Sequence, residues 1–270
     1  MNRLILPLIF SALPFQVLAH GFDAHPQGLS GTQLTFGTTV ADVGDNSASI
    51  VELRGASAFD FGRGVSLQFD WGFFGNDDRI DGVDDTDGFK NLRLLTAVRM
   101  SPDLTLGASA SYIKIEREET DSLGLHFLWD DSATRVEAIA EAFESPIDTA
   151  TYLGLTTTTP LAGMPDTDFF AAVDHIDGAD LDRESAQIGL RHSYSPNWAL
   201  SAALTHDDQY GHTNELRVGA DYSLSAGRTA HAFIGAGEDS ASAGITFRYA
   251  VGAARTAPLF DLSLFSAAFR

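Results

Sequence analysis

Apolar and polar residues alternate along most of this chain with a period of two. Between Leu104 and Tyr112, every second side chain is apolar, and the residues between them are Thr, Gly and Ser. The segments 65–73, 215–224 and 243–251 alternate in the same way. A period of two places successive side chains on opposite faces of an extended strand. The pattern predicts β-strands with one apolar face and one face of small, polar or charged residues.

Similar segments recur along the chain, each of about nine to twelve residues, the length that crosses a membrane at a steep tilt. Strands of soluble sheets are usually shorter. If successive segments run up and down, a strand near 167–173 is required between the segments 149–157 and 185–194. Counting it predicts fourteen strands, ending at 242–251. Twelve or sixteen are the alternatives.

The connections between these segments fall into two sets. One set is short and turn-like, as at 61–64 and 195–197, where Gly, Pro and Asn favour tight turns. The other set is acidic and mostly longer, as at 75–88 and 174–184. Short turns at one rim and longer loops at the other are typical of membrane barrels. The fold class predicted is therefore all-β, a transmembrane antiparallel up-and-down β-barrel. A soluble β-sandwich with an apolar interior is the alternative.

The N-terminal residues have the features of a secretory signal. Residues 4–18 carry no charge and follow Arg3, and Val17 and Ala19 provide the small residues that signal peptidase accepts. A membrane-anchoring helix is the alternative, but the run is shorter than about 20 residues and two prolines interrupt it. We expect a signal peptide at 1–19, a barrel at 20–252, and a tail or closing strand at 253–270.

Composition narrows the range of sites and partners. The chain has no Cys, which excludes disulfides and thiolate metal sites. Its formal charge is −20, and removal of Arg3 with the signal leaves 16 basic against 37 acidic residues. Nucleic acid as a partner requires clustered Lys and Arg, which a chain so acidic does not provide.

Charged residues recur on the polar face of the predicted strands. In a barrel with its apolar face toward lipid, they would project inward and line a pore. The predicted pore-lining residues are Glu52, Arg54, Asp70, Arg93, Arg99, Arg135, Glu137, Arg191, Glu215, Arg217, Asp221 and Arg248. Opposed charges would order water and solutes in an open lumen. The alternative is that they pair across strands and brace a narrow or occluded lumen.

Two stretches resemble the Gram-negative general porins. Residues 222–229 contain a Tyr-x-Leu-Ser turn followed by an Arg-Thr pair, and 189–204 reads as strand, Ser-Pro-Asn turn and strand. The chain resembles a small, divergent member of this porin family. The resemblance implies a bacterial outer-membrane location, no enzymatic activity, and a water-filled channel for passive diffusion of ions and small hydrophilic solutes. The glycine-bearing constriction-loop motif of the larger porins has no counterpart in this sequence.

The partners expected in that location are outer-membrane lipid and lipopolysaccharide, the barrel-assembly machinery, and the solutes themselves. An acidic outer rim would favour entry of cations, whereas the inner Arg residues would retard them. Weak cation selectivity is therefore expected from the balance of charge in the sequence. Aromatic residues near the strand ends, among them Phe74, Trp129 and Tyr249, are expected to form the interfacial girdles.

An acidic loop suggests a cation site. Four carboxylates, Asp81, Asp84, Asp85 and Asp87, lie close together in the sequence, and calcium takes six to eight oxygen ligands. The spacing is not that of an EF-hand, and a solvated anionic loop is the alternative. We therefore expect no cofactor, with loop-bound Ca²⁺ as the alternative.

Two other functions remain open from the sequence. One is an outer-membrane hydrolase, because His206, Asp207 and Asp208 are adjacent and would lie at the outer rim. The other is a non-conducting adhesion or scaffold barrel. His192, next to Ser193, is expected on the lipid-facing row near a rim, where catalysis is not its expected role.

Overall fold

The computed structural model describes residues 28–44, 46–80, 83–115, 118–131, 133–144, 149–178, 183–208, 213–225 and 227–251. The predicted signal peptide and the tail at 253–270 lie outside these residues. Fourteen strands run through the described part. They are β1 (Gly28–Val43), β2 (Asn46–Asp60), β3 (Val65–Ile80), β4 (Val83–Arg99), β5 (Leu104–Ile115), β6 (Glu118–Asp130), β7 (Arg135–Glu144), β8 (Thr149–Pro160), β9 (Thr167–Gly178), β10 (Arg183–Ser195), β11 (Trp198–Asp207), β12 (Thr213–Ser225), β13 (Arg228–Gly237) and β14 (Ser240–Val251).

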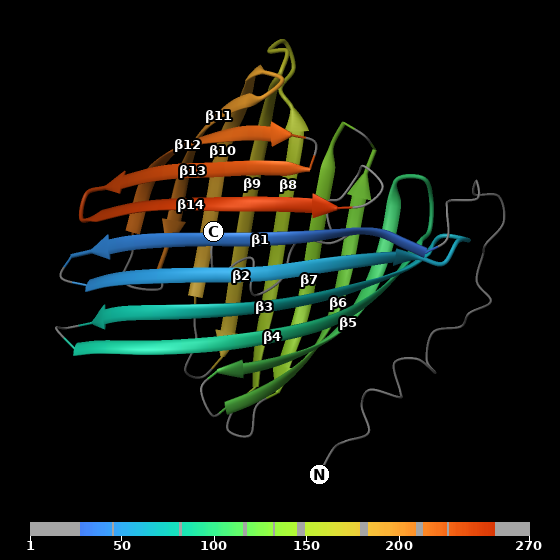
Figure 1. Ribbon diagram of the computed structural model, residues 1–270, viewed down its shortest axis with the longest axis horizontal. Coiled ribbons are helices and arrows are strands. Elements are labelled where there is room, and N and C mark those ends of the chain that lie inside the picture. Colours follow the sequence, from blue (N-terminus) through green and yellow to red (C-terminus); the bar gives the residue numbers. More distant parts are fainter. Residues whose placement is uncertain are drawn as a thin grey trace.

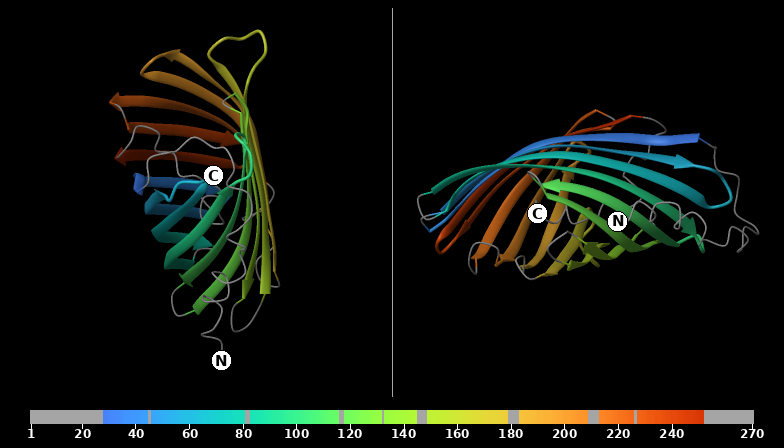
Figure 2. Two further views of the ribbon diagram at one scale, coloured as in Figure 1. Left: turned by 90° about the vertical axis from the view of Figure 1, so that its right-hand side faces the viewer. Right: turned by 90° about the horizontal axis from the view of Figure 1, so that it is seen from below.

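These strands form a closed, up-and-down antiparallel barrel. Each strand pairs with its neighbours in sequence, and β1 pairs with β14 from Thr32↔Val251 to Val43↔Ser240, which closes the ring. In Figure 1, β1–β4 and β13–β14 lie in front and cross β8–β10 behind them. Strands on opposite walls cross in this way because a barrel closes only when its strands tilt from the axis. Figure 2 shows the same walls from the side and from below.

The predicted fold class and strand number are confirmed. The strand inferred near 167–173 exists as β9, and the last described strand ends at Val251, as expected. Among the described residues, no helix has the length and apolar character needed to cross a membrane.

The prediction of long acidic loops is wrong. We call the rim that holds the β1–β2, β3–β4 and β9–β10 connections the acidic rim. The intervals between strands are two to five residues at this rim and two to six at the other rim. Residues 75–80 and 83–88 continue the β3–β4 hairpin, with Asn76 opposite Asp87 and Ile80 opposite Val83. The acidic composition does not prevent this, because the backbone ladder satisfies the peptide groups of both strands whatever their side chains are.

The β3–β4 hairpin therefore extends the acidic rim. Its strands have 16 and 17 residues, whereas β7 has ten. At about 3.3 Å per residue, this is roughly 55 Å against roughly 33 Å of strand. After tilting, β7 spans about the height of an outer-membrane apolar band, and the hairpin reaches beyond it.

The two faces of the sheet have the reverse of the polarity found in a soluble barrel: apolar side chains cover the outer face and polar side chains cover the inner face. In β6, Leu123, Leu125 and Phe127 on the outer face are exposed, whereas Ser122 and His126 between them are buried. Large exposed apolar side chains occur in the same way on the outer face of most strands. A soluble barrel or sandwich would bury this face, and soluble proteins rarely expose so much contiguous apolar surface. The soluble β-sandwich alternative is therefore wrong.

Candidate functional site: the barrel lumen

The strand register places every predicted pore-lining residue on the inner face. Arg54 and Arg248, for example, both lie opposite Thr35, whose side chain is only 1% exposed inside the barrel. The inner residues are Glu52, Arg54, Asp70, Arg93, Arg99, Arg135, Glu137, Arg191, Glu215, Arg217, Asp221 and Arg248. A single period-two register produces this agreement, because alternate residues of a strand share a face.

Polar side chains fill one side of the lumen, which we call the packed half. It comprises the inner faces of β3–β8 and the acidic-rim end of β9. Arg93 donates from Nε to Asp70 Oδ2 at 2.6 Å, and its side chain is 4% exposed. Glu141 accepts hydrogen bonds from the hydroxyls of Ser111 and Ser122. This side of the lumen is braced by paired groups with little solvent access, which is the second of the two alternatives left open by the sequence.

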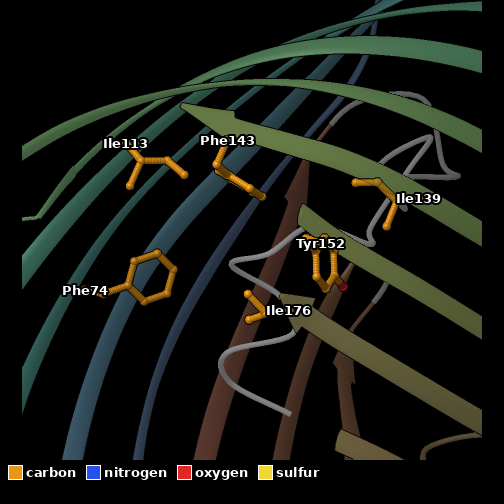
Figure 3. Packing of buried hydrophobic residues seen from close by; sticks show 6 residues of the cluster. All are labelled: Phe74, Ile113, Ile139, Phe143, Tyr152 and Ile176. Carbon is orange, nitrogen blue, oxygen red and sulfur yellow. The ribbon is translucent and has the colours of Figure 1, made fainter. Parts of the chain in front are cut away.

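Apolar side chains add to this filling near the acidic rim. Figure 3 shows six buried residues from five strands gathered there: Phe74, Ile113, Ile139, Phe143, Tyr152 and Ile176. The hydroxyl of Tyr152 donates to Asp174 Oδ1 at 2.6 Å, so its polar end is satisfied while its ring is buried. The expectation that Phe74 belongs to an interfacial girdle is wrong, because its side chain points inward and is 4% exposed.

Sequence reasoning missed this cluster because it assigned one polarity to each face of a strand. The available signal was local: Ile113 and Phe143 are bulky residues in register with the polar positions of their own strands. These bulky exceptions on the polar face are the sequence signal for an apolar cluster inside the barrel.

The opposite side of the lumen, which we call the open half, contains a cavity of about 310 Å³. It comprises the inner faces of β10–β14, β1 and β2 and the turn end of β9. The cavity is lined by polar, charged and aromatic side chains, including Glu52, Phe170, Gln187, Arg191, Ser201, Arg217, Asp221, His231, Phe233 and Thr246. Four of these residues, Glu52, Arg191, Arg217 and Asp221, carry charge, so the cavity is suited to a hydrophilic solute.

Three interactions order the charged groups of this cavity. Arg191 Nε donates to Asp221 Oδ2 at 2.9 Å, and His231 Nδ1 lies 2.9 Å from Asp221 Oδ1. Arg217 Nε donates to Glu215 Oε2 at 3.0 Å. In addition to these three polar contacts, Cζ of Arg217 lies over the Phe233 ring, 5.3 Å from its centroid. The paired groups hold one another in fixed orientations around the space.

Two glycines give the aromatic rings their places in the cavity wall. A Cβ on Gly189 would lie 2.5 Å from Cζ of Phe170, and one on Gly244 would lie 2.4 Å from Cε1 of Phe233. Both approaches are shorter than side chains tolerate, so only glycine lets each ring lie flat over the neighbouring strand.

The possible cation-binding loop lies largely outside the described residues. Asp81 is outside them, and Asp84, Asp85 and Asp87 are placed only as backbone of β4. Within the part of the chain whose side chains the structure describes, no group of three or more His, Cys, Asp or Glu residues is arranged to hold a metal ion. Loop-bound calcium therefore stays a prediction.

The histidines considered for hydrolysis occupy separate environments. His206 Nδ1 lies 3.1 Å from Asn214 Oδ1, while the next residue, Asp207, points to the other face and pairs with Arg183. Asp208 Oδ1 accepts from the backbone N–H of Glu184 at 2.7 Å. His192 is exposed on the outer face, as predicted, and its Nδ1 lies 2.9 Å from the Thr167 hydroxyl. Neighbours in a strand face opposite ways, so sequence adjacency does not create a His–Asp pair here.

Comparison with known proteins bears on the fold. No family model matches the chain. No curated protein matches it in sequence. Among solved structures, the outer-membrane protein Omp33 of Acinetobacter baumannii has a TM-score of 0.50 at 10% identity, covering 83% of this chain and 99% of Omp33. CdiB of the same organism has a TM-score of 0.52 at 8% identity, covering 82% of this chain and 60% of CdiB. A variant of the Rh. blastica porin reaches 0.47 at 9% identity, covering 82% and 99%.

The fold is that of an outer-membrane β-barrel. The resemblance inferred from the turn motifs is thus confirmed at the level of architecture. In an outer-membrane barrel the exposed Trp129 and Trp198, which lie at the turn ends of β6 and β11, occupy girdle positions. The apolar outer face of the strands corresponds to the lipid-facing band of that fold.

Proposed function

We propose that this protein resides in the bacterial outer membrane and forms a narrow, water-filled pore for small hydrophilic solutes. The observation that carries the proposal is the inverted polarity of the barrel, apolar outside and charged inside, around a cavity lined by charged side chains. An apolar outer face is stable only in lipid, and a charged inner face is stable only with partners or water.

The proposed passage runs through the open half. Arg191 is 42% exposed there, so its guanidinium has room for water although Asp221 is its partner. In the packed half, the inner side chains around Arg93, Glu141 and Tyr152 are buried against one another, which narrows that side of the lumen. A barrel of this strand number with an empty interior would admit large solutes. Filling half of the interior supports a smaller passage.

The first test is folding into a closed barrel. The unboiled protein in mild detergent is expected to migrate differently from the boiled protein, because a closed ladder of backbone hydrogen bonds resists detergent. Migration at the unfolded position without boiling would contradict the barrel itself.

The second test is conduction in planar bilayers, with two neighbouring substitutions as a matched pair. Ser201→Trp places a large ring in the cavity and is expected to lower single-channel conductance severalfold. Ala202→Trp, the next residue of β11, places the same ring on the exposed outer face and is expected to leave conductance unchanged. Equal conductance in both variants would move the passage elsewhere, and no conductance in wild-type barrels would contradict the pore.

The packed half favours one other candidate, a non-conducting scaffold barrel whose interior serves stability. That function predicts correct folding and heat-modifiable migration without discrete conductance. The association with lipopolysaccharide and the barrel-assembly machinery follows from the proposed location and stays a prediction with it.

A further inference from the structure

In each of three ion pairs on the inner face of the open half, the Arg side chain is more exposed than its carboxylate partner. In the pair of Arg191 with Asp221, the side-chain exposures are 42% and 24%. They are 21% and 6% for Arg217 with Glu215, and 25% and 10% for Arg54 with Glu52. In each pair the guanidinium lies toward the lumen and the carboxylate lies against the wall.

The wall holds these carboxylates by additional contacts. Glu215 Oε2 also accepts from the Ser242 hydroxyl at 2.7 Å, and Asp221 Oδ1 lies 2.9 Å from His231 Nδ1. Each of these carboxylates therefore has two partners. A guanidinium carries five N–H donors in a planar fork, and the bond from Arg191 Nε to Asp221 uses only part of them.

The guanidinium of Arg217 is additionally held in place by an aromatic ring. It lies 5.3 Å from the centroid of Phe233, a residue of the cavity wall. Arg248 is also exposed on this inner face, opposite Thr35. The surface available to a solute in the open half is therefore cationic, although the whole chain carries a formal charge of −20.

We propose that the cavity of the open half is an anion site, which selects small solutes bearing a carboxylate or phosphate group. Arg191 and Arg217 are its specificity-determining residues, since both line the cavity and each is more exposed there than its carboxylate partner. This inference rests on the proposed pore, whose passage it assigns to anions. It differs from the cation preference expected from the balance of charge, because exposure and not charge count decides what a solute meets.

Salt concentration separates the effect of the acidic rim on ion selectivity from the effect of the guanidiniums in the cavity. Exposed charges act over about 30 Å at 0.01 M salt and about 8 Å at 0.15 M. The acidic rim should therefore attract cations at the lower concentration and have little effect on the lumen at the higher one. The cavity guanidiniums contact the permeating ion directly and continue to act.

The experiment measures reversal potentials across KCl gradients near 0.01 M and near 0.15 M. It compares wild type, the charge-matched single variants Arg191→Gln and Arg228→Gln, and the double variant Arg191→Gln, Arg217→Gln. Wild type is expected to favour Cl⁻ over K⁺ near 0.15 M. Removing one guanidinium about 6 Å from the ion should change the permeability of each ion about threefold in a water-like dielectric, down for Cl⁻ and up for K⁺, and so reduce the Cl⁻/K⁺ ratio about tenfold. The double variant Arg191→Gln, Arg217→Gln should lose the preference. Arg228→Gln removes the same charge as Arg191→Gln, but at the exposed start of β13, over Tyr249, and should retain the preference for Cl⁻.

Citrate serves as the probe for a site that recognises carboxylates. Micromolar to millimolar citrate is expected to interrupt the wild-type current and to have no effect on the double variant. A conducting wild type that prefers K⁺ near 0.15 M, or a double variant with unchanged selectivity, would overturn the anion site and leave the pore. A correctly folded wild type without conductance would overturn the pore and this inference together.

Discussion

The packed half and the open half of the lumen both hold Arg–carboxylate pairs, yet they expose them differently. Arg93 in the packed half is 4% exposed and its partner Asp70 is 13% exposed. Arg191 in the open half is 42% exposed and Asp221 is 24% exposed. A buried pair is costly to break because the remaining charge loses its partner without gaining water, whereas a hydrated pair contributes little. The same chemical groups therefore serve stability on one wall and are available to solutes on the other.

The largest expected difference between the halves is in the free energy of unfolding after removal of one guanidinium. Arg93→Gln leaves Asp70 without its cation inside the packed half and should cost about 3–5 kcal/mol. Arg191→Gln leaves Asp221 hydrated and still beside His231, and should cost about 0–1 kcal/mol. Urea titration of both variants in lipid vesicles measures the two values. Equal losses would show that the halves do not differ in solvent access.

A second substitution tests the assignment of inside and outside on which the comparison depends. Val218 is 49% exposed on the outer face, and the preceding residue Arg217 points into the cavity. Val218→Arg near the bilayer midplane should cost about 2–4 kcal/mol of folding free energy, because the charge enters lipid. Arg248→Ser, at an exposed position on the inner face opposite Thr35, should leave folding largely intact. The same folding titrations apply, and equal tolerance at both positions would contradict the register or the membrane.

The difference in solvent access can be measured directly because the chain contains no cysteine. Ser201→Cys places a thiol in the cavity, and Ser109→Cys places one in the packed half, where Ser109 is 2% exposed and lies 2.8 Å from His126 Nε2. A charged methanethiosulfonate reagent should modify the Ser201 variant at least about tenfold faster, since access controls thiol reactivity. Similar rates in the folded protein would remove the distinction between the halves.

The smallest expected effect is a pH dependence at the turn between β6 and β7, on the packed side. The backbone N–H groups of Thr134 and Ala133 donate to Asp131 Oδ1 at 2.7 and 3.1 Å and lower the pKa of this carboxyl. A lowered folded-state pKa means stabilisation that is present above the unfolded value, near pH 4, and is lost as the pH falls through the folded value.

Hydrogen exchange at the Thr134 amide is the measurement for this turn. Protection, corrected for intrinsic exchange, should decrease as the pH is lowered below about 4 in wild type. Asp131→Ser keeps a hydroxyl acceptor that does not titrate, and its protection should not change over this range. A pH-independent wild type would contradict the role of the Asp131 carboxylate.

The sequence by itself determined the strands, their number and their faces. Period-two alternation depends only on how neighbouring side chains project, so Arg217 and Val218 could be placed on opposite faces without knowing any partner strand. Because up and down segments must alternate, the sequence also required the strand that the structure contains as β9. The face of each residue is a local property of its strand, and the need for β9 follows from the number of segments. Neither depends on how the barrel closes.

Tertiary structure alone decided how the interior is divided. The alternation already places Phe74 on the inner face with Asp70, but whether it packs into an apolar cluster there depends on Ile113 and Phe143, which reach it only once β3, β5 and β7 have taken their places in the barrel. Whether Arg93 or Arg191 faces water depends on which partners surround each of them once β14 has paired with β1. Closure sets these distances through the tilt and stagger of all fourteen strands together. A pattern that repeats every two residues contains no information about the opposite wall.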